Sequence, residues 1–241
     1  MTRPPSRAAR VRTLKHAASA IVELTAPVFE QLRLIADAAQ TMDLAEATTT
    51  GALPAVDVER LERLAVGAVR AVELITGAGM AAIAERHPDV RMMNWWILRG
   101  SDVVPKRHVL NPGSDSFYDF SRLRWFHVPA DRGTATLIAP YVDSWGTDDL
   151  TITAAVPVLD DAAAITTIVA ADLDTRSYLR KVEELLRSSS PAALVDGENR
   201  VVVSTVPELE TGVRLSAVGS WTVEEHVAVV EFGWSLVLMT P

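Results

Sequence analysis

The sequence contains no cysteine, and this absence excludes several classes of protein at once. Without thiols the chain cannot be a disulfide-stapled scaffold, bind zinc or an iron–sulfur cluster through cysteine, or use a cysteine nucleophile. No apolar run approaches the ~18 residues of a membrane-spanning helix. The signatures GxGxxG, GxxxxGK[ST], GxSxG and HExxH are absent as well. The sequence therefore offers no sign of a membrane span or of the common nucleotide-binding, hydrolase and zinc-protease sites.

The composition is that of an ordinary globular chain. Its 241 residues are 49% hydrophobic and 22% charged, which is enough to bury a full core. The net charge of −8 argues against a protein whose whole surface binds nucleic acid. Basic residues gather at the start and no acid precedes residue 16, so residues 1–12 are interpreted as a disordered basic arm. We expect the protein to be cytoplasmic.

Residues 13–90 have the pattern of a helical region. Apolar residues recur at spacings of three and four, and Pro27 is expected to kink or restart the first helix because it lacks a backbone donor. A second helix is predicted with Asp57 as its N-cap. The apolar spacing extends the buried face of this second helix to Ile75 and Ile83.

From Met92 onward the apolar period changes to two, which indicates strands. The predicted strands are residues 136–142, 150–159, 164–173, 192–195, 201–205 and 226–239, the last with a bulge or hairpin at Gly233. One amphipathic helix is predicted over residues 175–187. Helices followed by runs of strands indicate an α+β architecture with an antiparallel sheet.

Residues 117–126 are chemically unusual because five aromatic side chains and two arginines fall within ten residues. Taken singly, each has an ordinary interpretation, with Trp125 and Phe126 in the core, the arginines in solvent and the downstream aspartates capping turns. The histidines are scattered, so we predict no metal site and place them at the surface or at strand edges. They are His16, His87, His108, His127 and His226.

Together with later segments, this stretch resembles a Cache domain. The matching segments, in order, are Trp125–Phe126, Pro140–Asp143, Thr151–Asp161 and Ile168–Leu173. Cache domains are extracytoplasmic sensor modules with a PAS-like sheet, common in chemoreceptors and sensor kinases. The resemblance implies that long N-terminal helices, within residues 13–90, pack on a PAS-like antiparallel sheet over residues 91–187. Residues 188–241 would then be a smaller C-terminal β extension, a reduced second module.

The amine- and amino-acid-binding members of the double Cache group carry a pocket signature, and this chain matches much of it. Leu123 stands where the signature has an arginine, with arginines on both sides, and Phe126 lacks the hydroxyl of the expected tyrosine. The ligand-binding residues that the resemblance implies are Tyr118, Arg122, Arg124, Trp125, Phe126, Tyr141, Asp143 and Asp172.

The chemistry of this set suits a small organic cation. Two carboxylates, Asp143 and Asp172, can hold an ammonium through charge-assisted hydrogen bonds. The aromatic rings would form walls that attract a cation through their π faces. Because Leu123 replaces the arginine, an amine or quaternary ammonium fits better than an α-amino acid, unless a bulge turns Arg124 inward.

Three functions remain open at this point. The first is a non-enzymatic cytoplasmic sensor of a cationic small molecule, with no cofactor or metal. It would dimerise through its N-terminal helices and signal through a separate protein such as a transcriptional regulator. The second is an enzyme acting on small amines or acids, because carboxylates beside aromatic rings can perform acid–base chemistry. The third is an interaction or scaffold protein with a vestigial pocket, whose basic arm contacts an acidic partner or nucleic acid.

Overall fold

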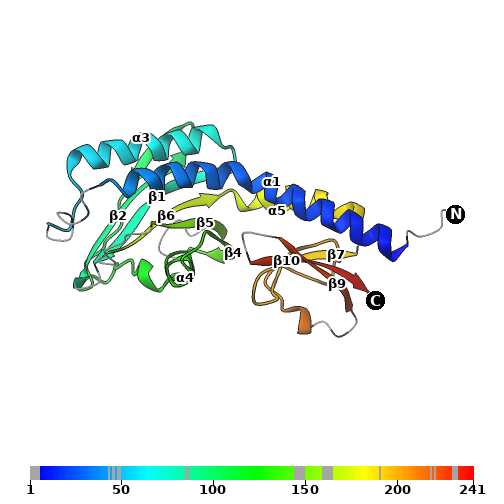
Figure 1. Cartoon of the computed structure of the whole chain (residues 1–241). Coiled ribbons are helices and arrows are strands. Elements are labelled where there is room, and N and C mark those ends of the chain that lie inside the picture. Colours follow the sequence, from blue (N-terminus) through cyan, green and yellow to red (C-terminus); the bar gives the residue numbers. More distant parts are fainter. Residues whose placement is uncertain are drawn as a thin grey trace. The chain divides into compact units, whose positions relative to one another are not determined.

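A computed structural model describes residues 6–42, 44, 47, 50–84, 87–143, 150–158, 165–189, 191–217, 219, 221–229 and 233–241. The chain divides into two compact units. The central unit is Pro27–Asp174, and the terminal unit combines Met1–Ala26 with Thr175–Pro241. Helix α1 (Arg7–Ala39) contributes residues to both units (Figure 1). Within the described residues, no helix is both long and apolar enough to cross a membrane.

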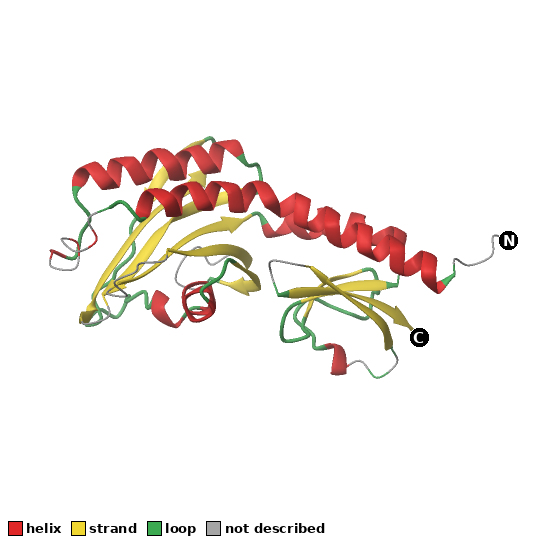
Figure 2. Cartoon of the chain, viewed as in Figure 1, coloured by secondary structure: helices red, strands yellow, loops and turns green. Residues whose placement is uncertain are grey.

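The central unit is built on a six-stranded antiparallel sheet with the strand order β3-β2-β1-β6-β5-β4. Figure 2 draws the strands as yellow arrows and the helices in red. Its strands are β1 (Ile75–Ala84), β2 (His87–Arg99), β3 (Asp102–Lys106), β4 (Thr136–Val142), β5 (Leu150–Val158) and β6 (Ile165–Leu173). Strand β1 pairs with β2 on one side and with β6 on the other. Its side chains are mostly buried on both faces of the sheet.

Helices cover both faces of this sheet. Helix α3 (Ala55–Ala71) packs on β1 and β2 through a buried stripe that runs from Leu61 to Val69 at helical spacing. Helix α4 (Arg124–Arg132) packs on β4, β5 and β6, and the single turn η1 (Phe120–Arg122) precedes it. On the α4 side, Trp95 of β2 joins Trp125 of α4 in one apolar cluster.

The terminal unit contains a four-stranded antiparallel sheet with the order β8-β7-β10-β9. Its elements are α5 (Thr175–Leu186), η2 (Arg187–Ser189), β7 (Ala192–Val195), β8 (Val201–Ser204), η3 (Leu215–Ala217), β9 (Thr222–Val229) and β10 (Trp234–Thr240). The buried ring of Tyr178 on α5 packs edge-on against Trp234, with 6.5 Å between ring centroids. Arg10 on α1 donates a hydrogen bond to the carbonyl of Met239 at 3.0 Å.

The prediction of one helix extending to Ile83 was wrong. Helix α3 ends at Ala71, and Ile75 to Ala84 form the central strand β1. The error has a physical cause, because a strand buried on both faces loses the alternation that distinguishes it from a helix. A Cβ at Gly79 would overlap the carbonyl oxygen of Asn94, so β1 and β2 approach closely only because residue 79 is glycine.

The N-terminal predictions also need correction. Residues 7–12 are not a disordered arm, because α1 begins at Arg7 and its first turns are fastened by ion pairs. Arg7 pairs with Glu225 at 3.2 Å and Arg10 with Glu224 at 3.4 Å. Residues 1–5 lie outside the described residues. Pro27 does not restart the helix but lies inside continuous α1, and Asp57 is not the cap of α3 but part of its first turn.

The later elements were predicted more closely. The strands β4 and β7 have the predicted bounds, and β8 and α5 each end one residue earlier than predicted. The strands β5 and β6 agree with the prediction over the described residues, and residues 159 and 164 lie outside them. The region 226–239 contains parts of two strands, β9 and β10, which form a hairpin, and Gly233 between them has a φ of 70°. The predicted boundary after residue 187 is not where the chain divides, because α5 belongs to the terminal unit. The end of the predicted motif, residues 159–161, lies outside the described residues.

Candidate functional site

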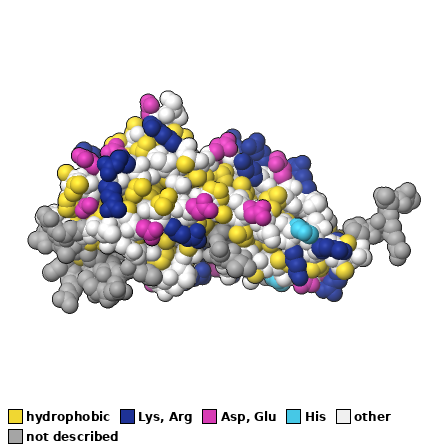
Figure 3. All heavy atoms as spheres, turned by 45° about the horizontal axis from the view of Figure 1, so that its top comes forward, with side chains coloured by type: hydrophobic (Ala, Val, Ile, Leu, Met, Phe, Trp, Pro, Cys, Tyr) yellow, Lys and Arg dark blue, Asp and Glu magenta, His cyan; other side chains and the backbone are white. Residues whose placement is uncertain are grey.

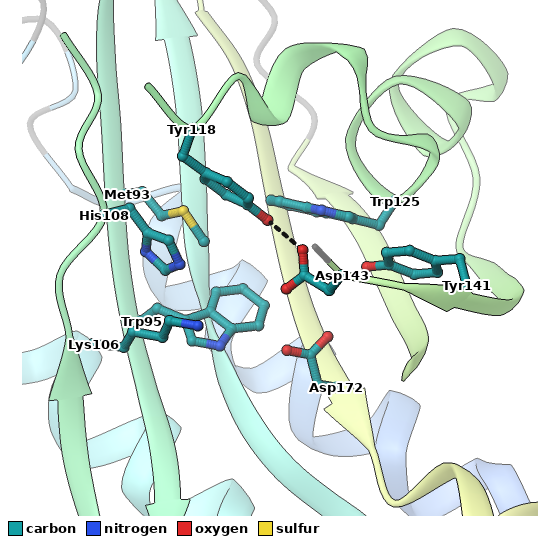
Figure 4. Close-up of a pocket in the computed structure, with 9 residues that line it drawn as sticks. All are labelled: Met93, Trp95, Lys106, His108, Tyr118, Trp125, Tyr141, Asp143 and Asp172. Atoms are coloured by element: carbon teal, nitrogen blue, oxygen red, sulfur yellow. Dashed lines mark hydrogen bonds between the residues drawn. The ribbon is translucent and has the colours of Figure 1, made fainter. Parts of the chain in front are cut away.

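A cavity lies in the central unit on the α4 side of the sheet (Figure 4). Strands β2, β3, β4 and β6, helix α4 and the connection between β3 and α4 each contribute to it. We call that connection, residues 107–123, the cap segment. The lining residues are Met93, Trp95, Lys106, His108, Tyr118, Trp125, Tyr141, Asp143 and Asp172.

The carboxylate of Asp172 is oriented by its neighbours in the sheet. Asp172 on β6 lies directly opposite Thr153 on β5, and the Thr153 hydroxyl donates to Asp172 Oδ1 at 2.8 Å. The Tyr141 hydroxyl in turn lies 3.0 Å from Thr153 Oγ1. On β1, the residue opposite Asp172 is Gly77, where a Cβ would lie 3.0 Å from Trp95 Nε1. A glycine at this position therefore lets the Trp95 ring lie beside the carboxylate.

The acidic side of the cavity holds two carboxylates and two phenols. Burial raises the pKa of Asp172 to about 7, the hydrogen bond from Thr153 opposes this rise, and the charge of Asp143 adds to it. Burial, reinforced by nearby aspartates, also raises the pKa values of Tyr118 and Tyr141 above the ordinary range. Both phenols therefore keep their protons at neutral pH. The Tyr118 hydroxyl donates to Asp143 Oδ1 at 3.5 Å, a long and weak hydrogen bond.

The opposite side of the cavity carries two basic residues. Lys106 ends β3, and its backbone pairs with that of Trp95. Burial lowers the pKa of His108 to about 4, and the charge of Lys106 lowers it further, so the imidazole is neutral at neutral pH. The His108 ring stacks on Tyr118 with 4.6 Å between centroids. Its Nδ1 is buried and has no hydrogen-bond partner among the described residues.

Aromatic rings line the cavity, and the space between the lining side chains is small. The centroids of Trp95 and Trp125 lie 5.9 Å apart, and both side chains are almost fully buried. The volume of the cavity is about 10 Å³, which is close to the space that one water molecule needs. A ligand larger than water must therefore displace the cap segment or turn the lining side chains.

The cap segment is fastened to the sheet beside Tyr118. Arg91 of β2 donates to Asp119 Oδ1 at 2.8 Å, and its guanidinium lies 4.9 Å from the centre of the Phe117 ring. Desolvation acts to raise the pKa of Asp119, but hydrogen bonding from Ser121 and the charge of Arg91 outweigh it and hold the pKa below its usual value. One sheet residue thus contacts both chain neighbours of Tyr118.

The structure gathers five of the eight predicted ligand-binding residues at the cavity and leaves three outside it. Phe126 lies in the apolar cluster, with its ring 5.0 Å from that of Phe120, and does not line the cavity. Arg122 is 87% exposed and pairs with Asp119 at 3.1 Å, and Arg124 is an exposed residue at the start of α4. Arg124 does not reach the cavity because it lies on helix α4. A bulge could turn its side chain inward only if this segment were a strand, and it is not. The five gathered residues are Tyr118, Trp125, Tyr141, Asp143 and Asp172.

Four lining residues were not predicted for the site: Met93, Trp95, Lys106 and His108. His108 was placed at the surface or at a strand edge, and it lies instead in the cavity wall. The position of Lys106 depends on the pairing of β3 with β2, which sets Lys106 opposite Trp95. No local signal carries that register, although alternation along β2 does place Met93 and Trp95 on one face. The described residues contain no cluster of three or more acidic or histidine side chains suited to a metal ion.

Comparisons with known proteins identify the fold. No family model and no curated protein sequence matches the chain. Among solved structures, the extracellular domain assigned to the histidine kinase mmHK1S-Z2 has a TM-score of 0.63 at 12% identity, over 98% of each chain. The ligand-binding domain of the Pseudomonas aeruginosa PAO1 amino acid chemoreceptor PctC, in complex with GABA, has a TM-score of 0.55 at 14% identity, covering 95% of this chain and 96% of that one. PctB from the same organism, in complex with L-Gln, has a TM-score of 0.59 at 15% identity, covering 95% and 88%.

At these identities the similarity establishes the fold. The expected α+β architecture, with a long N-terminal helix packed on antiparallel sheets, is confirmed as that of Cache-like sensor domains. The similarity covers nearly the whole chain, so it includes both compact units.

Proposed function

We propose that this chain, which has the fold of the extracellular ligand-binding domains of histidine kinases and chemoreceptors, is a non-catalytic sensor domain for a small molecule that bears an ammonium group. The observation that carries the proposal is the acidic side of the cavity. Asp143 and Asp172 face the same cavity, and the rings of Trp95, Trp125 and Tyr141 surround them (Figure 4). An ammonium removed from water needs charged hydrogen-bond acceptors and gains from aromatic faces, and this cavity supplies both.

The arrangement favours binding over catalysis. The phenols are held in their neutral donor form, and the imidazole of His108 is neutral and lies across the cavity from the carboxylates (Figure 4). The described lining residues include neither serine nor threonine, the hydroxyl nucleophiles of the common acyl-transfer sites. PctC in complex with GABA and PctB in complex with L-Gln are ligand-binding domains of the same fold, and they support a binding role.

Signal output would pass through α1, which contributes residues to both compact units. We propose that a ligand which favours one of two arrangements of this helix shifts the state presented to an output partner. Homodimerisation through α1 is part of the proposal. Acidic and basic side chains are interspersed over the exposed surface that carries α1 and α3 (Figure 3), with Glu30, Arg33 and Asp37 among the exposed residues of α1. If these charged side chains pair across the dimer, its dissociation constant should rise with salt in sedimentation experiments.

A thermal-shift screen tests the proposed function. The compounds are primary amines, quaternary ammonium salts and amino acids, each measured against the wild type and Asp172→Asn. A ligand at 100 times its dissociation constant stabilises the fold by about 2.7 kcal/mol, which is readily seen as a rise in melting temperature. We expect Asp172→Asn to lose that rise and Asp131→Asn to keep it, because the Asp131 side chain is 78% exposed and lies outside the cavity. A rise that survives in Asp172→Asn would place the ligand elsewhere, and turnover of the compound would show an enzyme.

A further inference from the structure

The cavity has two chemically distinct sides, and the proposed function uses only one of them. Figure 4 shows Asp143, Asp172 and Tyr141 on one side and Lys106 and His108 on the other. The strand order explains this separation. Lys106 belongs to β3 and Asp172 to β6, with β2 and β1 between them. At about 4.8 Å between neighbouring strands, the two backbones are about 14 Å apart. Both side chains reach into the space between, beside the ring of Trp95.

The basic side offers both a charge and an unused hydrogen-bonding atom. Lys106 brings an ammonium to the cavity wall and acts electrostatically on both His108 and Asp172. The Nδ1 atom of His108 is buried and without a partner among the described residues. A buried ring nitrogen without a hydrogen bond is costly, and such atoms in native structures usually mark a site that a ligand or ordered water completes.

We propose that Lys106 and His108 form an acid-binding subsite, so that the ligand is a small zwitterion with its ammonium at Asp143 and Asp172. This inference rests on the proposed function and specifies the second charged group of the ligand. A purely cationic ligand would enter a narrow cavity whose wall includes the Lys106 ammonium, and these two like charges would repel each other. A zwitterion places an opposite charge beside each side of the cavity, and its acid group accepts a hydrogen bond from the orphaned His108 nitrogen.

Lys106 is thus a specificity-determining residue, and matched ligand pairs test it. The probes are 4-aminobutyrate against butylamine and 3-aminopropionate against propylamine, together with L-alanine against ethylamine. Each pair shares its amine and differs in the acid group. We expect wild type to bind at least one acid of these pairs about tenfold or more tightly than its amine partner, a difference of about 1.4 kcal/mol. Calorimetry or thermal shift gives the dissociation constants.

Variants of the lysine isolate its role. Lys106→Met should abolish the preference for the acid while keeping or improving the affinity for the matching amine, because both the acid's partner and the like charge are removed. Lys106→Arg should retain the preference, since a guanidinium also binds carboxylates. Lys15→Met is the matched control, because Lys15 is exposed on α1. The melting temperature of each unliganded variant shows whether the fold is intact.

The outcomes distinguish failure of the acid-binding subsite from failure of the proposed ammonium-binding function. If amines bind as tightly as their acid partners, or if Lys106→Met weakens both members of a pair equally, the acid-binding subsite is refuted and the ammonium site stands. If neither amines nor amino acids shift the melting temperature of the wild type, the proposed function fails and this inference fails with it.

Discussion

Asp172 should make the ligand-free protein less stable as the pH rises, and Asp172→Asn should remove that loss. The carboxyl group has a pKa of about 7 in the fold against an ordinary 3.8. The folded protein therefore holds this proton more tightly than the unfolded chain between about pH 4 and pH 7. Wherever the folded state binds the extra proton, stability falls as pH rises. At about 1.4 kcal/mol for each pH unit, the whole window corresponds to about 4 kcal/mol.

Urea unfolding at pH 5, 6, 7 and 8, followed by circular dichroism, measures this effect. Asparagine cannot ionise, so the variant avoids the free-energy cost of ionising a buried carboxyl group as the pH rises. The free energy of unfolding of Asp172→Asn minus that of the wild type should grow by about 3 kcal/mol between pH 5 and pH 8, most of it below pH 7. Asp102→Asn, which changes an exposed carboxylate, should show no such growth. A difference that stays constant or shrinks with pH would refute the argument that burial dominates at Asp172.

The same titration predicts how ligand affinity depends on pH. An ammonium bound at Asp172 favours the ionised carboxylate, so binding must displace its proton below about pH 7. The association constant should rise by up to about tenfold for each pH unit below 7 and level off above it. Calorimetry in buffers of different ionisation enthalpy should detect release of a proton at pH 6 and little release at pH 8. Equal proton release at both values would contradict the assignment.

Two further predictions concern the cap segment and the central strand. Arg91→Met should speed hydrogen exchange of the Tyr118 amide, which donates to a cap carbonyl, by about tenfold while β1 amides are unaffected, because a partly buried ion pair is lost. Arg122→Met, which removes an exposed partner of the same aspartate, should leave that exchange nearly unchanged. Equal effects in both variants would contradict the argument that the Arg91–Asp119 pair fastens the cap segment. Gly79→Ala should cost about 3 kcal/mol or more in urea unfolding, because its Cβ meets backbone. Gly67→Ala, in open space on α3, should stabilise by about 1 kcal/mol, and equal effects of the two alanines would refute the packing argument.

The strands that could be predicted are those with turn-forming residues near their ends or with a clear apolar alternation along one face. β4 begins three residues after Gly133, which ends α4 in a left-handed conformation, and it ends at the residue before Asp143. The turn between β7 and β8 contains Asn199 with a φ of 57°, a conformation that asparagine tolerates. β1 has no such signal, because its position depends on which strands lie beside it, and that is a property of the whole sheet.

The residues of the cavity also fall into those that the sequence could predict and those that it could not. Asp143 and Asp172 were predicted through a sequence resemblance that spans about thirty residues between them, and both line the cavity. Arg124 was considered because it is near Trp125 in sequence, but helical geometry directs it to solvent. Lys106 and His108 were missed because strand pairing and the path of the cap segment bring them to the cavity.

The division of the chain also dictates an order of events during synthesis. The central unit is one continuous stretch, so all its strands are available once Asp174 has left the ribosome. The terminal unit needs both ends of the chain, since Arg10 binds the carbonyl of Met239 and pairs with Glu224. The first half of α1 therefore lacks its final partners until more than two hundred further residues have been translated. A ribosome-stalled chain ending near residue 220, which leaves Asp174 outside the exit tunnel, should have a folded cavity and an N-terminal segment still open to proteases.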